Sequence, residues 1–141
     1  MTNRPWHLWV IPLFAILWNS LGVFDFFMTV SKNEAYLSQF SQQQLAFFYG
    51  FPLWVYFAWA AAIFGGFVGS FLLVFRKRTA IPCFLVSFIA ILLVGFQNYV
   101  LDKGMAVMGD TFSLVFEVLI IFMGLGLYLY ARAMLKQNRL Q

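Results

Sequence analysis

Hydrophobic residues gather into four long stretches of this chain, separated by short polar segments. The stretches cover residues 6–30, 51–75, 80–101 and 111–131. Each is long enough for the roughly 20 residues that an α-helix needs to cross a bilayer. Because backbone N–H and C=O groups must find partners within hydrocarbon, apolar stretches of this length predict helices. The pattern therefore predicts an all-α fold, a four-helix transmembrane bundle that forms a single domain over residues 1–141.

The connection between the first two stretches, Ser31 to Gly50, is the longest of the polar segments. Within it, Ser41 and Gln44 have the spacing of a helix-capping box, and the apolar segment 45–49 follows directly. The connection therefore predicts a short amphipathic helix lying on the face of the bundle. Two interpretations are open for this helix, a surface cap or a lid over a pocket.

Composition makes lipid the solvent of this chain. It is 63% hydrophobic and 10% charged, whereas a soluble domain carries about 25% charged residues. The net charge of +4 does not indicate nucleic acid, because the basic residues lie at the ends of the predicted helices. With one cysteine and one histidine, the chain offers no intrachain disulfide, no Cys-based metal cluster and no bis-histidine haem site. We expect no cofactor and no bound metal.

Lysine and arginine predict the orientation in the membrane. One side holds most of them, in the N-terminal segment, the second connection and the tail: Arg4, Arg76, Lys77, Arg78, Arg132, Lys136 and Arg139. The other side has only Lys32 and Lys103. The positive-inside rule then places both termini in the cytoplasm of a multi-pass protein, and the first and third connections outside.

The second stretch carries small residues at helical spacing. They form two rows along it: Ala58, Ala62, Gly66 and Ser70 in one, and Ala61, Gly65 and Gly69 in the other. Small-xxx-small rows mark faces where helices in lipid approach closely. We therefore expect Gly66→Leu and Gly69→Leu to destabilise the bundle more than Gly104→Leu. The rows fit packing within one chain or against a second copy.

Two carboxylates, Asp25 and Glu117, lie inside predicted spans, where an ionised acid is costly. At 1.5 Å per residue, they lie about 8 and 9 Å from the outer ends of their helices. Gln97 and Asn98 lie one turn from the outer end of the third span, and Asn19 lies deeper. We expect these five side chains to line a cavity open to the outside, and the two acids to share a proton as a carboxylate pair does.

A purely structural interpretation of these polar residues is also open. Asp25 would then be protonated and bonded to a neighbouring helix, and Glu117 would lie close enough to the interface to be wet. Asn19 and Gln97 would join helices through hydrogen bonds. No Lys or Arg lies at the depth of the acids, so a salt bridge does not neutralise them.

Several short segments together resemble a family of small membrane proteins. They include the run 17–29 with Asn19 and Asp25, the segment 51–54, the glycine-rich segment 65–70, and Arg76 with Ala80. In these segments the chain resembles small four-span inner-membrane proteins of Gram-negative bacteria, which carry no established activity and are sometimes labelled "sugar transporter". The resemblance implies a location in the inner membrane. In size and span number the chain also resembles small multidrug resistance exporters, but it has a second acid and a longer outer loop.

These features favour a small transport or binding protein whose outward-facing acidic pocket handles protons, cations or a small polar solute. The alternative is a non-transporting accessory or structural subunit of a larger membrane complex. The expected partners are the lipid bilayer and a second copy or a larger membrane complex, and no nucleic acid. An enzyme is not expected, because the sequence offers no nucleophile–base pair and no metal-ligand set.

Overall fold

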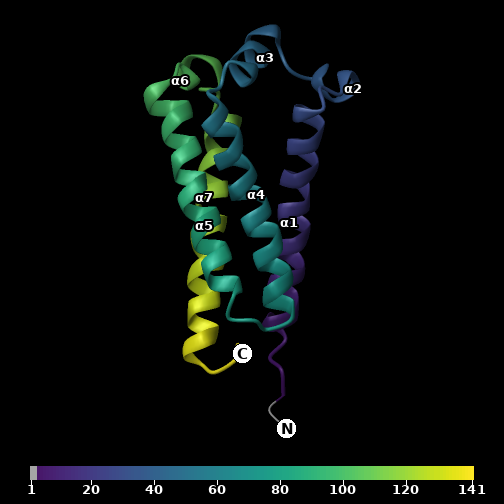
Figure 1. Cartoon of the computed structure of the whole chain (residues 1–141), viewed down its shortest axis with the longest axis vertical. Helices are drawn as coiled ribbons and strands as arrows, with labels where there is room; N and C mark the ends of the chain where they lie inside the picture. The colour runs from purple at the N-terminus through teal and green to yellow at the C-terminus, as the bar shows by residue number, and fades with distance from the viewer. Residues whose placement is uncertain (1–2) are drawn as a thin grey trace.

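The computed structural model describes residues 3–141 and contains four long helices, as the hydrophobic pattern predicted. The long helices are α1 (His7–Val30), α4 (Leu53–Val74), α5 (Ala80–Phe96) and α7 (Thr111–Lys136). Shorter elements lie between them: α2 (Glu34–Leu37), α3 (Gln42–Tyr49), the π-helical η1 (Gln97–Leu101) and α6 (Gly104–Val107). The long helices run side by side, with α2, α3 and α6 at one end and both chain termini at the other (Figure 1). We call these the loop end and the terminal end.

The predicted bounds of the third span, 80–101, agree with the observed helix, which continues past Phe96 as η1 and reaches Leu101 through a π-helical turn. The main difference lies in the fourth span. The fourth helix continues beyond the predicted residue 131 to Lys136. Its last turns are amphipathic, because Ala131 and Met134 are buried while Arg132 and Lys136 are exposed.

The predicted short helix of the first connection is α3, and its capping box is formed. The Ser41 hydroxyl accepts from the Gln44 backbone N–H at 3.1 Å, and the Gln44 side chain accepts from the Ser41 N–H at 3.0 Å. Two hydroxyl groups tie α3 to the long helices. Tyr49 donates to the Thr29 carbonyl of α1 at 2.9 Å, and Tyr56 of α4 donates to the Phe48 carbonyl at 2.7 Å.

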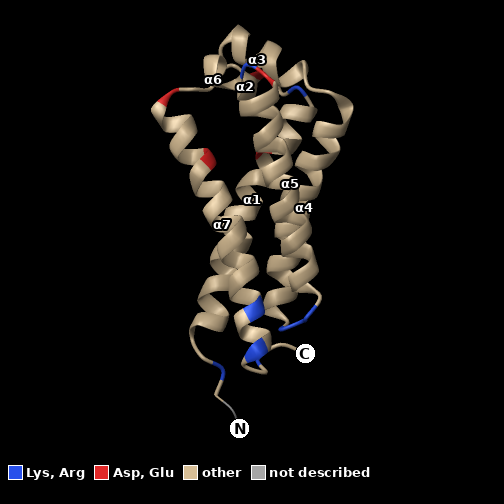
Figure 2. Ribbon diagram, turned by 90° about the vertical axis from the view of Figure 1, so that its left-hand side faces the viewer, with Lys and Arg blue, Asp and Glu red and all other residues tan. Residues whose placement is uncertain are grey.

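The four long helices form a row in the order α1, α4, α5, α7. The backbone of α4 packs closely on α1 and α5, and that of α5 packs on α7, whereas α1 and α7 approach each other less closely. At the loop end α7 leans away from the other helices, which gives the bundle an open outline when it is turned by 90° (Figure 2). The bundle therefore has close packing around α4 and a looser seam between α1 and α7.

Small residues of α4 bring its two neighbours close. Gly65 lies so near α5 that an added Cβ would be 3.0 Å from the Cys83 carbonyl oxygen. A Cβ on Gly69 would be 2.9 Å from the ring of Phe84, which is 1% exposed. On this helix the buried small residues are Ala62, Gly66, Gly69 and Ser70, while Ala58 is half-buried.

Gly104 is an unsuitable reference for the glycines of α4, so the expected ranking of the three leucine variants needs correction. It is buried at the start of α6, and a Cβ there would overlap the backbone carbonyl of Asn98. A leucine at position 104 therefore disturbs the turn between η1 and α6. Gly126 is the better reference, because a Cβ on it meets no atom within 4 Å.

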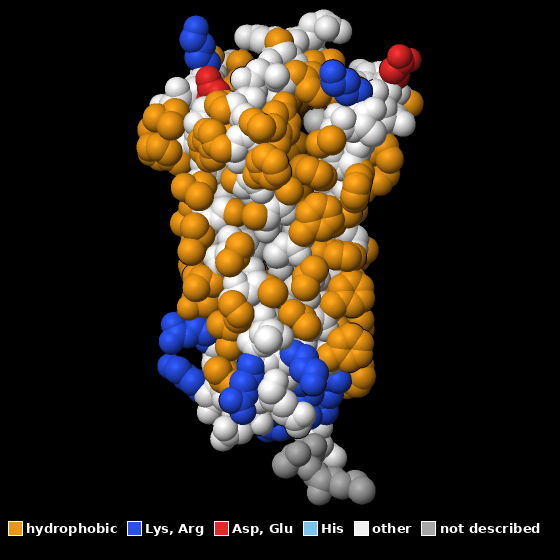
Figure 3. All heavy atoms as spheres, in the orientation of Figure 1, with side chains coloured by type: hydrophobic (Ala, Val, Ile, Leu, Met, Phe, Trp, Pro, Cys, Tyr) orange, Lys and Arg blue, Asp and Glu red, His pale blue; other side chains and the backbone are white. Residues whose placement is uncertain are grey.

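On the face that Figure 3 shows, apolar side chains cover the middle of the molecule, and charged side chains lie at its two ends. Large apolar residues of α1 are more than half exposed, among them Leu17 at 63% and Leu21 at 62%. Such a surface is unstable in water and stable in lipid. With four helices long and apolar enough to cross a bilayer, the chain is a multi-pass membrane protein.

Both chain ends are anchored to the connection between α4 and α5. Arg4 donates to the Val74 carbonyl at 2.9 Å and its guanidinium stacks on Trp9 at 3.6 Å. The C-terminal residue Gln141 exchanges backbone hydrogen bonds with Arg76 and Arg78 at 2.6 and 2.8 Å. The C-terminus is thus fixed beside Arg76 and Arg78 at the terminal end, where most Lys and Arg residues lie (Figure 2).

Candidate functional site

Asn19 lies in the contact between α1 and α4, apart from the acidic residues. Its amide donates to the Ala15 carbonyl at 2.8 Å and to the Ser70 hydroxyl at 3.3 Å. Its oxygen faces Gly66, where an added Cβ would overlap it. Asn19 therefore joins two helices near the middle of the membrane, which is the structural role that the sequence left open for it.

Asp25 lies on the face of α1 that is turned toward α7. Residues seven apart share a face of an α-helix, and Asp25 is at this spacing from Trp18 and Ile11. The Trp18 ring packs against Phe116 of α7, with centroids 6.0 Å apart, and Ile11 lines a groove with α7. The carboxyl group of Asp25 is thus directed to the flank of α1 beside this contact.

Tyr36 of α2 donates its hydroxyl hydrogen bond to the Asp25 carboxyl group. The side chain of Asn33 caps α2 by accepting from the Tyr36 N–H at 2.9 Å, and the Tyr36 ring packs edge-on against Phe24 at 5.6 Å. Burial, reinforced by the bond to Asp25, raises the pKa of the Tyr36 hydroxyl above its ordinary value of 10.0. The hydroxyl therefore stays protonated as a donor at neutral pH, and α2 is held against the end of α1.

Glu117 lies on the face of α7 that packs against α5. Its Oε1 is 2.9 Å from the position that a Cβ on Gly95 would take, so a side chain at position 95 would require the carboxyl group to shift. Gly124, seven residues further along α7, faces Phe88 and Ile91 of α5 in the same way. Among the described residues 3–141, the Glu117 carboxyl forms neither a hydrogen bond nor an ion pair.

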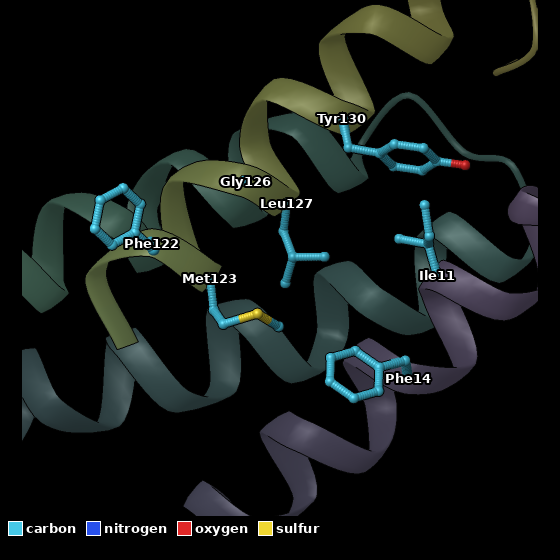
Figure 4. Close-up of a pocket in the computed structure, with 7 residues that line it drawn as sticks. All are labelled: Ile11, Phe14, Phe122, Met123, Gly126, Leu127 and Tyr130. Atoms are coloured by element: carbon cyan, nitrogen blue, oxygen red, sulfur yellow. The ribbon is translucent and has the colours of Figure 1, made fainter. Parts of the chain in front are cut away.

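Below the acids, α1 and α7 enclose an apolar groove of about 310 Å³. The residues that line it are Ile11, Phe14, Phe122, Met123, Gly126, Leu127 and Tyr130. Figure 4 shows Leu127 and Met123 on the side of α7 that faces α1, opposite Ile11 and Phe14. At the terminal end, His7 and the Tyr130 hydroxyl are hydrogen-bonded at 2.7 Å and close the groove.

Gln97 and Asn98 lie in η1, where the helix widens. Gln97 is 8% exposed, its side-chain amide donates to the Asp102 carboxylate at 3.3 Å, and its backbone carbonyl accepts from the Asp102 N–H at 2.9 Å. Gln97 therefore completes the last turn of the third span. The Asn98 side-chain oxygen is buried and has no hydrogen-bond partner in the described structure. Single π-helical turns of this kind occur frequently at functional sites.

The five predicted polar residues are thus divided among four places. Asp25 is bonded to Tyr36 of α2, Glu117 lies in the α5–α7 contact, Gln97 and Asn98 are in the π-helical turn, and Asn19 is in the α1–α4 contact. Within residues 3–141 no hydrogen bond joins Asp25 to Glu117 or either acid to an amide of this set. A proton shared between the two acids stays a prediction.

Two contributors to the site, Tyr36 and Gly95, escaped the sequence analysis. Tyr36 follows Asp25 by only eleven residues, but nothing in its neighbourhood marks it as a partner. Gly95 lies among several other glycines. The seven-residue spacing of Ile11, Trp18 and Asp25 was visible in the sequence and could have assigned Asp25 to an interhelical face.

The geometry defines a class, an integral membrane protein with four spans and two intramembrane carboxyl groups near one end. In the part of the chain that the structure describes, no three His, Cys, Asp or Glu side chains gather as metal ligands. Comparisons of the chain with protein-family models, with curated proteins and with solved structures found no match.

Proposed function

We propose that this chain is a small transport or binding protein that takes a cation, in exchange with a proton, at its intramembrane carboxyl groups near the loop end, Glu117 of α7 and Asp25 of α1. The observation that carries the proposal is the state of Glu117. Its carboxyl group lies within a span and has no hydrogen bond or ion pair among the described residues. Intramembrane acids of this kind mark ion and substrate pathways by default, since an unpaired carboxylate is costly in hydrocarbon.

The neighbourhood of Glu117 supports a cation in preference to an anion. Asp25 lies at a similar depth on α1, and basic residues are absent from the described parts of the spans at this level. Most Lys and Arg residues lie instead toward the opposite end, whereas Lys32 and Lys103 lie in the connections of the loop end (Figure 2). A bound cation or proton beside the two carboxyl groups would lower the free-energy cost of holding them within the membrane.

Proton release on cation binding tests this proposal. Tetramethylammonium is added to the protein in weakly buffered nanodiscs, and the pH change is recorded across several starting pH values. We expect saturable proton release from the wild type and none from Glu117→Gln. Glu34→Gln, which changes an exposed acid of α2, is the matched control and should behave as the wild type. Equal release from all three proteins would contradict a site at Glu117.

An accessory subunit is the second candidate function, and one observation favours it. The spans α1 and α7 are buried far less by the rest of the chain than α4 and α5 are. A larger membrane complex could cover this apolar surface. In that case Glu117→Gln would alter stability or assembly and leave cation binding absent in every variant.

We further propose that the protein lies in the inner membrane of a Gram-negative bacterium with both termini in the cytoplasm. The support is the gathering of Arg and Lys at the terminal end. In a Cys83→Ala background, cysteines at Lys32 or Met105 should react with an impermeant thiol reagent added outside, and one at Lys77 should not. The reverse labelling pattern would overturn this topology.

A further inference from the structure

A pocket distinct from the α1–α7 groove lies at the loop end, between α1 and α4. The two helices separate there beneath α3 (Figure 1), and the pocket has a volume of about 520 Å³. Its walls include Phe26 and Val30 of α1, Tyr49 of α3, and Tyr56 and Phe57 of α4. Small-molecule sites have volumes of about 300–1,000 Å³ and mostly apolar, aromatic walls. The pocket therefore has the size and the lining of a site for one small apolar molecule.

The polar side chains in the wall of this pocket are engaged, with one exception. The Tyr49 hydroxyl donates to the Thr29 carbonyl, and the Tyr56 hydroxyl donates to the Phe48 carbonyl. The exception is Lys32, which lines the pocket and forms no ion pair within the described residues 3–141. Its ammonium nitrogen is 5.1 Å from the centre of the Tyr49 ring. No acidic residue lines the pocket, so it presents one positive charge without a counter-ion.

The backbone after α1 fixes Lys32 beside the aromatic wall. Lys32 has a φ of 55°, in the left-handed region that residues other than glycine rarely adopt. Its N–H donates to the Thr29 carbonyl at 3.1 Å, and the same carbonyl accepts from the Tyr49 hydroxyl at 2.9 Å. One carbonyl thus holds both the turn that carries Lys32 and the end of α3.

The charge and the apolar wall follow one another along α1. The lining extends from Phe26 to Lys32, six residues or about 9 Å at the rise of a helix. Phe26 lies within the span, whereas Lys32 follows its last residue, Val30. A lysine side chain at such a place keeps its ammonium group in the polar region and its stem on apolar surface. An amphiphile inserted in the same leaflet has its own charged and apolar parts in this order.

We propose that this pocket binds a single-chain anionic amphiphile, a medium-chain fatty acid whose carboxylate pairs with Lys32 and whose chain lies against the aromatic wall. Charge complementarity decides the occupant, because a cation would be repelled by Lys32 and a neutral chain would leave its ammonium group unpaired. In this arrangement α3 is a lid over the pocket. The inference goes beyond the proposed function and does not depend on it, since neither Asp25 nor Glu117 lines this pocket.

Two pairs of variants separate the charge of the pocket from its volume. Lys32→Gln removes the charge and Lys32→Arg keeps it, whereas Lys103→Gln removes a loop-end charge that does not line the pocket. Val30→Trp places a larger side chain in the apolar wall. Val10→Trp is its matched control, because Val10 and Val30 lie on the same helix with similar exposures of 52% and 49%, and Val10 does not line the pocket.

The experiment compares decanoate with decanol, which has the same chain length and no charge. Binding of each radiolabelled compound to protein in phosphatidylcholine nanodiscs is measured by equilibrium dialysis at pH 9, where a carboxyl group is ionised and a lysine is protonated. Uptake by empty nanodiscs is subtracted. We expect saturable binding of decanoate, about fivefold weaker in Lys32→Gln and unchanged in Lys32→Arg and Lys103→Gln. Decanol should bind the wild type more weakly than decanoate and be indifferent to Lys32→Gln. Val30→Trp should weaken the binding of both compounds, and Val10→Trp should weaken neither.

Three outcomes would overturn this inference. If decanol binds the wild type as tightly as decanoate, the pocket is an apolar site that does not select an anion. If Lys103→Gln weakens decanoate binding as much as Lys32→Gln does, the attraction comes from the general charge of the loop end and not from this pocket. If the wild type shows no saturable binding of decanoate, the pocket does not hold the proposed ligand.

Discussion

The contact between α4 and its neighbours differs from the seam between α1 and α7 in almost every physical respect. Around α4, glycines and small residues bring backbones together, and the polar groups of Asn19 and Ser87 are hydrogen-bonded across helices. Between α1 and α7, large side chains such as Trp18 and Phe116 meet and border an apolar groove of about 310 Å³. Glu117, on the face of α7 toward α5, has no hydrogen-bond partner in the described structure. The first region is closely packed and polar groups within it are paired, whereas the second is loosely packed.

The largest expected effect is the loss of stability when α4 is overpacked. Gly66→Leu and Gly69→Leu should each lower the free energy of unfolding by about 2–3 kcal/mol, because the new side chain meets Asn19 or the buried Phe84 ring. Gly126→Leu should change it by less than about 0.5 kcal/mol. Thermal unfolding in one detergent measures the difference. Equal stability of the three variants would remove the contrast between the two regions.

Gly95→Ala should displace the Glu117 carboxyl group without unfolding the protein. The added methyl group takes the place beside Glu117 Oε1, and the flexible carboxyl group must turn away. We expect tetramethylammonium binding to weaken about tenfold, a change of about 1.4 kcal/mol. Gly22→Ala is the control, because its Cβ would make an ordinary 3.6 Å contact with Ile63. Unchanged binding in Gly95→Ala would show that the position of Glu117 is irrelevant to the site.

Tyr36→Phe should loosen the attachment of α2 to the seam. The lost hydrogen bond to Asp25 is worth about 1 kcal/mol. Amide hydrogen exchange of residues 33–38 should accelerate about fivefold, since local opening costs correspondingly less. Tyr49→Phe, which removes the bond from α3 to the Thr29 carbonyl, should leave residues 33–38 unaffected. Equal protection of α2 in wild type and Tyr36→Phe would contradict the contact.

The smallest expected effect concerns pH and the start of α7. Hydrogen bonds from Ser113 hold the pKa of Asp110 below its ordinary value of 3.8. Because the folded pKa is lowered, this cap stabilises α7 fully at neutral pH, and its contribution disappears as the pH falls through the lowered value. In Asp110→Asn the contribution should be independent of pH between 5 and 2. The difference in melting temperature between wild type and Asp110→Asn, followed over that range, measures it.

Most of the fold could be predicted from the sequence because lipid imposes simple rules. Four apolar stretches became the four spans, and Ser41 with Gln44 predicted the cap of α3, since capping depends on neighbouring residues alone. The extension of α7 to Lys136 was missed because a charged, amphipathic last turn has no hydrophobic signal. The π-helical turn at Gln97 was missed because no residue pattern in the apolar run announces the extra residue.

The candidate site was harder to predict. Counting residues gives the depth of a side chain along its helix, but it does not give the neighbouring helix toward which that side chain points. Counting residues gave Asp25 and Glu117 similar depths, but it did not tell which neighbour each helix faces. That depends on how far the glycines of α4 let α1 and α5 approach. Asn19 lies on the same helix as Asp25, yet its side chain faces Gly66 and donates to the Ser70 hydroxyl in the contact with α4.

Infrared difference spectroscopy of the carboxyl groups tests the cation site most directly. Spectra of the protein in nanodiscs are recorded with and without tetramethylammonium near neutral pH. A carboxyl site that takes a cation in exchange for a proton should lose intensity in the protonated C=O band and gain carboxylate bands. This change should be absent in Glu117→Gln and altered in Asp25→Asn. A spectrum that the cation leaves unchanged in the wild type would contradict a cation site at Glu117 and Asp25.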